Sequence, residues 1–526
     1  AELSRVTFAP AGAEADVAPG ATVLEAASAA GVVIPAPCGG RGACGRCAVV
    51  VVEGSLAPPS EREVAALARA RVDASTVRLA CMASVAGPVT VRALVVSADA
   101  SAASPAPRAH IASAPFVAGV DIGTTSVSAR VVDMALGRTL GTGRVLNRQA
   151  SFGADVLSRV SAAIEGRGEE LREAAERSVA DALRAAAGDT GEKRTAFERV
   201  VIAGNTAMVS LLLGADIGGL AAHPFTHALP ADGSGGDARL CSALNSAEVL
   251  CVPPAAAFVG GDLVSALLAE GLAEGGEGSV LVDLGTNAEV AAIGSEAVYV
   301  TSAPAGPAFE GWGIACGGQA GSGGIIGVAE AEAGGLRPVT PSGAPTHLTG
   351  SGVIAVIAYL RRTRHLDAGG LMSPAGVAGS RFFTVDGVRA VSLGTDPADR
   401  SVYLTQLDVR ALQSAKAAVC VALRAVAGRA GLSGGSVRRI FVTGAFGGAL
   451  DPLELVELGV LPSDVAGAVV QTEDAALRGA AAAAFEPGLL DDARALVARA
   501  EHVDLAAGPT FGEEFVASTR FERFTL

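Results

Sequence analysis

Lysine is almost missing from this chain of 526 residues, since only Lys193 and Lys416 occur among its 40 basic side chains. Aromatic residues make up 4%, with a single tryptophan. The 54 acidic side chains outnumber the basic ones and give a net charge of −14, which disfavours a protein that binds duplex nucleic acid. Nothing physical requires arginine in place of lysine, so we interpret that bias as one of coding.

Long apolar runs are absent as well. Hydrophobic residues make up 50% of the chain, enough for sizeable cores, but no stretch reaches the ~18 uninterrupted apolar residues that span a bilayer. Residues 352–360 are apolar but far too few. Residues 1–5 lack the basic-then-apolar order of a signal peptide. We therefore expect a cytoplasmic protein that binds neither membrane nor nucleic acid.

Composition divides the chain into three parts. Residues 1–97 contain short segments with β propensity, and Ser60 is expected to cap a helix at 61–71. Residues 98–115 contain three prolines and mostly small side chains, which predicts a flexible linker. In residues 116–526 apolar strands alternate with helices, which predicts an α/β body.

The eight cysteines are unevenly spread. Cys38, Cys44 and Cys47 form a Cys-x5-Cys-x2-Cys pattern, and Cys81 follows after 33 intervening residues. Four thiolates fill the terminal positions of a [2Fe–2S] cluster, and the loop glycines (39, 40, 42 and 45) permit tight turns at positive φ. A tetrahedral zinc site is the alternative, although zinc sites usually use two short cysteine pairs. The pattern resembles a plant- or adrenodoxin-type ferredoxin domain of β-grasp fold, and this resemblance covers 1–97.

Two segments of the body repeat one order: an apolar strand, Asp-x-Gly-Thr, a polar turn and a second strand. Their candidate phosphate-handling residues are Asp121, Gly123, Thr124, Thr125 and Ser126 in the first, and Asp283, Gly285, Thr286 and Asn287 in the second, near 280–291. The glycines permit close approach to phosphate oxygens, the turns supply donors, and the aspartates can hold the hydration shell of Mg²⁺. The repeat predicts two related lobes.

Two further strands run into glycine-rich turns. Their candidate binding residues are Gly204, Asn205 and Thr206 in one turn, and Gly444, Ala445, Phe446, Gly447 and Gly448 in the other. The second turn suits a base and ribose, yet either one alone could be a plain strand-to-helix turn. Gly-x4-Gly-Lys-Ser/Thr is absent, which excludes a P-loop.

Together the four segments resemble the superfamily of acetate kinases, sugar kinases, heat-shock chaperones and actin (ASKHA). That resemblance implies ATP in a cleft between two duplicated lobes, with phosphates held by 121–126 and 283–287 and adenosine contacted by 444–448. It also implies lobe closure coupled to ATP.

A ferredoxin module fused to such an ATPase is similar to the reductive activators of corrinoid proteins. The stretches that carry this match lie at 147–159, 204–208, 283–289, 306–311, 404–413 and 511–515. The resemblance implies an ATP-hydrolysing enzyme that passes one electron from its [2Fe–2S] cluster to Co(II) of a corrinoid protein, restoring Co(I) for a methyltransferase system. It also implies a low-potential electron donor, and it alone suggests a homodimer.

The sequence departs from that family in two places. The family member with a ferredoxin domain carries a middle domain, and because Asp121 follows the linker almost at once, we expect that domain to be missing. Late in the core, residues 471–477 stand where Gly-Asn-Ala-Ala is expected. Residues 482–526 contain no cysteine, which excludes the variant with a C-terminal pair of [4Fe–4S] clusters.

Rival interpretations remain open. One is an activator of another low-potential metalloenzyme, such as a 2-hydroxyacyl-CoA dehydratase, although those activators lack a plant-type module. Another is a redox-regulated small-molecule kinase. A third is a ferredoxin-tethered, chaperone-like clamp that binds partners without reducing them. Glu289 faces either the nucleotide or a solvated strand end.

Overall fold

The structure is a computed structural model of the whole chain. The residues that it describes are 3–9, 12–30, 32, 34, 36, 40, 42, 47–69, 77–93, 115–153, 155–189, 194–318, 321–330, 336–374, 381–395, 401–444, 450–508 and 510–526. The chain divides into two units. The first comprises Ala1–Pro253, Gly260–Asp262 and Ala480–Pro487, and the second comprises Pro254–Val259, Leu263–Gly479 and Gly488–Leu526. Except for Pro115, the predicted linker lies outside the described residues.

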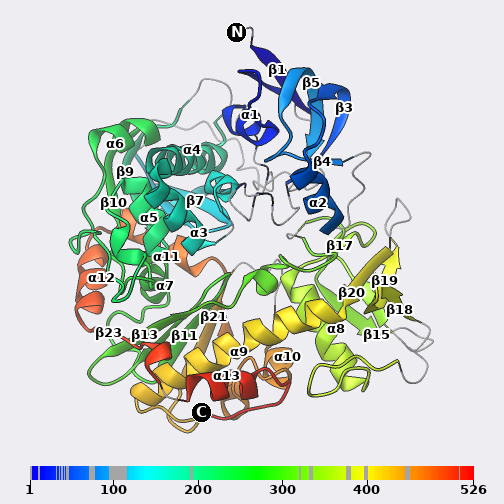
Figure 1. The fold of residues 1–526 in the computed structure, drawn as a ribbon. Helices are drawn as coiled ribbons and strands as arrows, with labels where there is room; N and C mark the ends of the chain where they lie inside the picture. Colours follow the sequence, from blue (N-terminus) through cyan, green and yellow to red (C-terminus); the bar gives the residue numbers. More distant parts are fainter. Residues whose placement is uncertain are drawn as a thin grey trace. The chain divides into compact units, whose positions relative to one another are not determined.

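The N-terminal part of the first unit is a five-stranded mixed sheet in the order β2-β1-β5-β3-β4, drawn in blue in Figure 1. Strand β1 pairs antiparallel with β2 and parallel with β5, and β3 pairs antiparallel with β5 and β4. The elements are β1 (Ser4–Ala9), β2 (Ala13–Val17), α1 (Val23–Ala29), β3 (Ala48–Leu56), α2 (Glu61–Arg69), β4 (Val77–Leu79) and β5 (Val85–Ala93). This is the predicted β-grasp arrangement. Ser60 caps α2 as predicted, because its Oγ accepts from the Glu63 N–H at 3.2 Å.

The first lobe of the body is a sheet in the order β10-β9-β6-β7-β8. Strands β6, β7 and β8 form an antiparallel meander, while β9 runs parallel to β6 and β10 parallel to β9. The strands are β6 (Phe116–Ile122), β7 (Ser126–Asp133), β8 (Arg138–Leu146), β9 (Phe197–Gly204) and β10 (Ser246–Cys251). The helices are η1 (Arg148–Ser151), α3 (Val156–Ala162), η2 (Ala163–Arg167), α4 (Gly168–Ala187), α5 (Thr206–Leu213), η3 (Gly218–Leu220), α6 (Ala238–Leu244) and α7 (Gly261–Ala269).

The second lobe repeats this topology in the order β22-β21-β11-β12-β13-β23. Strands β11, β12 and β13 form the antiparallel meander, and β21 and β22 continue from β11 as parallel neighbours. The strands are β11 (Ser279–Leu284), β12 (Ala288–Ile293), β13 (Val298–Ala303), β21 (Arg439–Thr443), β22 (Val469–Gln471) and β23 (Ala500–His502). Five strands thus correspond one to one between the lobes, which confirms the duplication predicted from the repeated motif.

Smaller sheets and most of the remaining helices complete the second unit. The small strands are β14 (Gly324–Ile325), β15 (Gly327–Glu330), β16 (Leu336–Val339), β17 (His347–Leu348), β18 (Phe382–Val385), β19 (Val388–Thr395) and β20 (Ser401–Thr405). The helices are η4 (Pro307–Glu310), α8 (Gly350–Arg362), α9 (Gln406–Arg429), α10 (Pro452–Glu457), η6 (Ser463–Ala468), α11 (Ala475–Phe485), α12 (Leu489–Ala498), η7 (Leu505–Ala507) and α13 (Phe511–Ser518). The division into units runs through α7 and α11.

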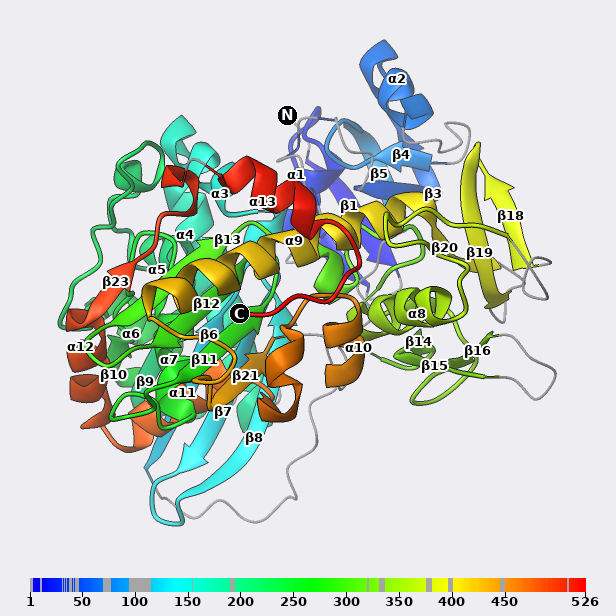
Figure 2. The ribbon, with the colours of Figure 1, turned by 90° about the horizontal axis from the view of Figure 1, so that it is seen from below.

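Helix α9 is the single helix in the described part of the chain that is long and apolar enough to cross a membrane. It packs against β12 and β13, as Figure 2 shows, and most of its residues are buried in the core of the second unit. A buried core helix passes the same test of length and composition. Its apolar side chains are therefore accounted for by packing.

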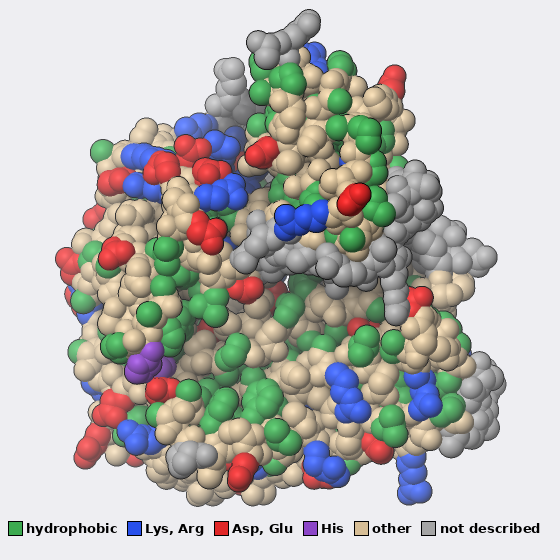
Figure 3. Space-filling view, viewed as in Figure 1, with side chains coloured by type: hydrophobic (Ala, Val, Ile, Leu, Met, Phe, Trp, Pro, Cys, Tyr) green, Lys and Arg blue, Asp and Glu red, His purple; other side chains and the backbone are tan. Residues whose placement is uncertain are grey.

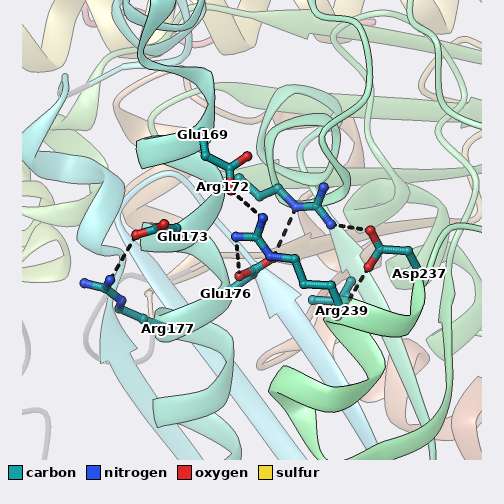
Figure 4. A network of polar contacts seen from close by, with 8 residues as sticks. Glu169, Arg172, Glu173, Glu176, Arg177, Asp237 and Arg239 are labelled. Carbon is teal, nitrogen blue, oxygen red and sulfur yellow. Dashed lines mark hydrogen bonds and ion pairs between the residues drawn. The ribbon is translucent and has the colours of Figure 1, made fainter.

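Charged side chains gather over α4, where Figure 3 shows acidic and basic groups intermixed at the upper left. Figure 4 resolves them as a network between α4 and α6. Arg172 bonds Glu176 at 3.1 Å and Asp237 at 2.5 Å, while Arg239 bonds Glu176 at 3.0 Å and also Glu169. Each arginine therefore has carboxylate partners, and the network fastens α6 to α4.

Strand register brings the predicted motifs together within each lobe. In the first lobe Ile122 lies beside Gly204 on parallel strands, and in the second lobe Asp283 lies beside Thr443. The carboxyl ends of parallel neighbours meet at one sheet edge. The β6–β7 turn (hairpin 1) therefore adjoins the turn after β9, and the β11–β12 turn (hairpin 2) adjoins the turn after β21.

Two glycines allow close packing beneath hairpin 1. A Cβ on Gly119 of β6 would overlap the backbone of Ala481 in α11. A Cβ on Gly204 would overlap both the side chain and the carbonyl of Ile122. Neither position has room for a larger residue unless the backbone shifts.

We expect Gly119→Ala to lower the free energy of unfolding by about 3 kcal/mol, because the added methyl group meets backbone rather than a flexible side chain. Gly87→Ala in β5 is the matched control, since nothing lies within 4 Å of its Cβ position. Thermal unfolding followed by circular dichroism tests the pair. Equal midpoints for the two variants would contradict the close packing of α11 on β6.

Candidate functional site

Two of the four predicted cluster ligands converge in the first domain. The Sγ atoms of Cys47, just before β3, and Cys81, just after β4, lie 3.3 Å apart. A tetrahedral metal ion with metal–sulfur bonds of about 2.3 Å holds its thiolates about 3.8 Å apart, so these two thiols fit ligands of the same ion. Cys38 and Cys44 lie outside the described residues. The hydrogen bond between the Cys47 and Cys81 thiols lowers the pKa of Cys47 to about 7, although burial opposes that shift.

Two of the four loop glycines, Gly40 and Gly42, lie among the described residues and adopt the positive φ that glycine permits, at 78° and 68°. Residues 39 and 45 lie outside the described residues. A Cβ on Gly42 would overlap the sulfur of Met82, and one on Gly40 would lie 3.8 Å from the Cβ of Cys81. The chain can therefore turn tightly beside Cys81 because side chains are missing at these positions.

A buried ion pair fixes the segment that carries Cys81. Glu63 is fully buried and accepts from Nε and Nη2 of Arg78 and from the Leu79 N–H, each at 2.9 Å. The Ala80 N–H donates to the carbonyl of Cys47 at 2.8 Å and joins the two cysteine-bearing segments. Sequence reasoning missed this pair, because two charges 15 residues apart form no local pattern.

In hairpin 1 the backbone carbonyls are held by groups that the sequence did not single out. The Nδ2 of Asn147 donates to the Gly123 carbonyl at 2.8 Å, and its backbone N–H donates to the Thr125 carbonyl at 3.0 Å. Between them, Nη2 of Arg159 donates to the Thr124 carbonyl at 2.6 Å. Three consecutive carbonyls are thus held by two residues outside the turn.

This arrangement determines where the amides of hairpin 1 point. In a trans peptide the carbonyl and the following N–H lie on opposite sides. The N–H groups that follow the held carbonyls therefore point away from Asn147 and Arg159, and they belong to Thr124, Thr125 and Ser126. Successive amides aimed to one side of a turn favour an anion. Direct contact between these residues and a phosphate stays a prediction.

The turn after β9 supports hairpin 1 from inside the lobe. Asn205 is 4% exposed, and its side chain caps α5 by accepting from the Ala207 N–H at 3.0 Å. Thr206 is fully buried, and its carbonyl accepts from Ser210. Gly204 lies directly against Ile122. These contacts are structural, and the predicted nucleotide contact of this turn remains untested.

The two hairpins differ by one residue in the register of the pair that closes the turn. Leu284 and Ala288 enclose three residues in hairpin 2, whereas Ile122 and Val127 enclose four in hairpin 1. The Gly306 N–H donates to the Thr286 carbonyl at 2.8 Å, as Asn147 does in the first lobe, and the Thr286 hydroxyl donates to Oε1 of Glu310 at 2.9 Å. Glu310, in η4, lay within a family-like stretch but received no role from the sequence.

Carboxylates gather around hairpin 2. Glu289 stands opposite Asp283 in the antiparallel register, whereas Asp121 in the first lobe stands opposite Ser128. Glu289 is 8% exposed and accepts from Ser302 at 3.2 Å, so it does not occupy a solvated strand end. Among the described residues no three His, Cys, Asp or Glu side chains form a metal-ligating group. A Mg²⁺ ion bound here would therefore keep water or phosphate as most of its ligands.

The predicted adenosine loop is described only at its first residue. Gly444 follows Thr443 at φ 135°, and Thr443 Oγ1 accepts from the Ala475 N–H at 3.4 Å. The other candidates lie outside the described residues, namely Ala445, Phe446, Gly447 and Gly448. Their contact with adenosine stays a prediction.

The departure at 471–477 has a conformational explanation. Asp474 has φ 47°, in the left-handed region that Asn and Asp enter more readily than other side chains. It directly precedes α11 (Ala475–Phe485). An aspartate at this position therefore adopts the conformation that the chain needs before the helix begins.

Three family models match successive parts of the chain. They are the 2Fe-2S iron-sulfur cluster binding domain at 6–86, the RACo middle region at 116–275, and the C-terminal domain of RACo, the ASKHA domain, at 277–525. The two RACo models together span well over half of the chain. The chain belongs to the family of reductive activators of corrinoid proteins, in which a [2Fe–2S] domain precedes an ASKHA-type body.

Two relatives illustrate this membership. The corrinoid activation enzyme RamQ of Eubacterium limosum is 29% identical over 429 residues, which span 76% of this chain and 69% of that protein. A solved structure of a reductive activator for corrinoid, iron-sulfur protein has the same fold, with a TM-score of 0.70 and 23% identity. That match covers 99% of this chain and 98% of the other.

The expectation that the middle domain is missing is wrong, because the model for that region matches 116–275. The physical reason is its topology. The strands of residues 116–275 form an antiparallel meander followed by two parallel strands, which is the same strand order as in the second lobe. The sequence pattern therefore assigned this region to one continuous body that starts at 116. The family models divide that body between residues 275 and 277. The outer boundaries at 97 and 116 stay predictions.

Replacing Cys81 with Ala should abolish the [2Fe–2S] absorption of anaerobically reconstituted protein, because it removes a thiolate positioned to share a metal ion with Cys47. Cys241→Ala is the matched control, since Cys241 lies on α6 in the first lobe. Ultraviolet–visible and electron paramagnetic resonance spectra measure the result. A full cluster signal in the Cys81 variant would rule out its role as a ligand.

Proposed function

We propose that the protein is an ATP-dependent reductive activator that returns the Co(II) of a corrinoid protein to Co(I) by transferring one electron. One observation carries the proposal. The chain joins a domain with two converging thiols to a duplicated body, and in the first hairpin of that body three successive carbonyls are held by Asn147 and Arg159, so that the amides following them point away from these two residues. Family membership supports a corrinoid protein as the partner. A methyltransferase system that uses Co(I) and an external low-potential electron donor complete the proposal.

The residues proposed to hold the [2Fe–2S] cluster are Cys38, Cys44, Cys47 and Cys81. When bound, a plant-type cluster supplies one electron near −400 mV, and each ~59 mV of unfavourable gap costs about tenfold in the equilibrium. The ion pair of Glu63 and Arg78 holds the Cys81 segment in place. Reduction of a cobalt centre of lower potential therefore needs coupling to a second source of free energy.

In this proposal the body supplies that coupling by binding and hydrolysing Mg-ATP. Hairpin 1 donates amide hydrogen bonds to phosphate, while Asp121 and Asp283 hold the hydration shell of Mg²⁺. Glu310, which accepts a hydrogen bond from the Thr286 hydroxyl, is proposed to orient water at hairpin 2. In this proposal the ATP-bound state binds more tightly to a corrinoid protein whose cobalt has lost an axial ligand. The ratio of its affinities for the two forms of the corrinoid protein sets how far the reduction equilibrium shifts.

The decisive experiment is anaerobic reduction of Co(II) corrinoid proteins by the pre-reduced full chain, with and without Mg-ATP. We expect the Co(I) spectrum to appear with ATP. Asp283→Ala should slow this reaction by about 100-fold, because the metal shell loses a carboxylate, while leaving the cluster spectrum intact. Equal reduction without nucleotide would contradict the coupling. Phosphorylation of an added metabolite would favour the kinase alternative, and binding without reduction would favour the clamp.

Glu310→Gln tests the proposed water-orienting group. It preserves the size of the side chain but removes its charge, so we expect the kcat of ATP hydrolysis to fall about 100-fold with the cluster unchanged. Glu330→Gln, on β15 of the same unit and exposed, is the control. Steady-state release of phosphate measures both variants. A normal kcat in the Glu310 variant would remove this residue from the chemistry.

A further inference from the structure

Arg159 is a buried cation to which the described residues offer no ion pair. Its side chain is 1% exposed within the first lobe. Each of its three nitrogens has a partner: Nε donates to the Gly153 carbonyl at 3.0 Å, Nη2 to the Thr124 carbonyl at 2.6 Å, and Nη1 contacts the sulfur of Met208 at 3.0 Å. All three partners are neutral.

Buried charges in proteins are normally paired, because an isolated ion loses its hydration without compensation. Arg172 in the same lobe, whose side chain is 14% exposed, follows that rule, since it pairs with Glu176 and Asp237. Arg159 does not follow it. The acidic side chain whose charge acts on the pKa of Arg159 is Asp155, which is exposed and caps α3. Burial accordingly lowers the pKa of Arg159 to about 9, and Asp155 opposes the shift only in part.

The position of Arg159 indicates which anion would balance it. Its Nη2 binds the Thr124 carbonyl on one side of the peptide, so the Thr125 N–H points to the other side. A hydrogen bond from a cation polarises the peptide group that accepts it and strengthens the donor on its far side. The positive charge of Arg159 therefore makes the Thr125 N–H a stronger hydrogen-bond donor on the far side of the peptide.

Among the described residues of the second lobe, no buried arginine donates a hydrogen bond to a carbonyl of hairpin 2. There the side chain that contacts the turn is Glu310, and Glu289 stands opposite Asp283. Both hairpins follow a strand that carries an aspartate, Asp121 or Asp283. Among the described residues only hairpin 1 also has a buried cation beside its turn, so its turn favours an anion more strongly than that of hairpin 2.

We propose that Arg159 is the positioning residue and buried counter-charge of hairpin 1, and that the polyphosphate of the bound nucleotide is the anion that balances it. The proposal rests on the nucleotide function proposed above. Arg159 does not touch the ligand in this scheme. It holds the Thr124 peptide in the orientation that receives phosphate and supplies positive charge behind it.

The test compares the full, reconstituted chain with the variants Arg159→Met, Arg159→Lys and Arg199→Met. Calorimetric titration measures binding of Mg-ATP, inorganic tripolyphosphate and adenosine. Arg159→Met should weaken ATP and tripolyphosphate binding by about 10-fold or more, the scale of a lost charge-assisted hydrogen bond, and leave adenosine affinity unchanged. Arg159→Lys should recover part of the loss, because it restores the charge.

Arg199→Met is the matched control for removal of a largely buried arginine. Arg199 pairs with Glu248 at 2.7 Å and donates to the Ala484 carbonyl at 3.2 Å, away from the turn. It should bind all three ligands normally. Wild-type affinity for ATP in Arg159→Met, or equal loss of ATP and adenosine binding, overturns the role of Arg159 and leaves the proposed function standing.

Two further outcomes concern a variant that does not fold and a wild-type chain that does not bind nucleotide. Where Arg159→Met does not fold, Arg159→Lys decides, because a single ammonium cannot reach all three partners. Weaker ATP binding with normal adenosine binding then supports the proposal, and unchanged ATP binding overturns it. If the wild-type chain binds neither ATP nor tripolyphosphate, the proposed nucleotide function fails and the role of Arg159 fails with it.

Discussion

The candidate nucleotide residues depend on one constraint, the parallel pairing of the strand before each Asp-x-Gly-Thr turn with a strand from much later in the chain. Strand β6 pairs with β9, and β11 pairs with β21. Since parallel neighbours end at the same edge, each hairpin lies beside a second glycine-rich turn without any direct sequence link between them. At hairpin 1 Gly204 permits this closeness, because a Cβ at that position would overlap Ile122.

Much of this architecture was accessible from the sequence. The duplicated strand-turn-strand motif predicted two lobes, the cysteine spacing predicted a ferredoxin domain, and positive φ was predicted for Gly40 and Gly42. These features are local, since each is encoded within a few neighbouring residues. The absence of a middle domain was wrongly predicted because that region shares its strand order with the second lobe, so composition marks no boundary between them.

The supporting groups escaped prediction for the opposite reason. Arg159 meets the Thr124 carbonyl across 35 positions of sequence, and Glu63 meets Arg78 across 15. Such pairs become visible only when helices are placed on their sheets. Family-like stretches did contain Arg159 and Glu310, but a stretch does not say which of its side chains turns inward. The two lobes therefore share a strand order but differ in the charged side chain that contacts the turn, which is Arg159 at hairpin 1 and Glu310 at hairpin 2.

The one-residue difference between the closing pairs of the two hairpins lies in the turns rather than in the strands. A residue gained or lost inside a strand would exchange its buried and exposed faces, since side chains alternate along the strand. The same change inside a turn leaves both flanking strands in phase, and the meanders on either side still match. A repeated strand-turn-strand unit can therefore vary the spacing of its turn, where the candidate binding groups lie, while the sheet beneath keeps the same strand order.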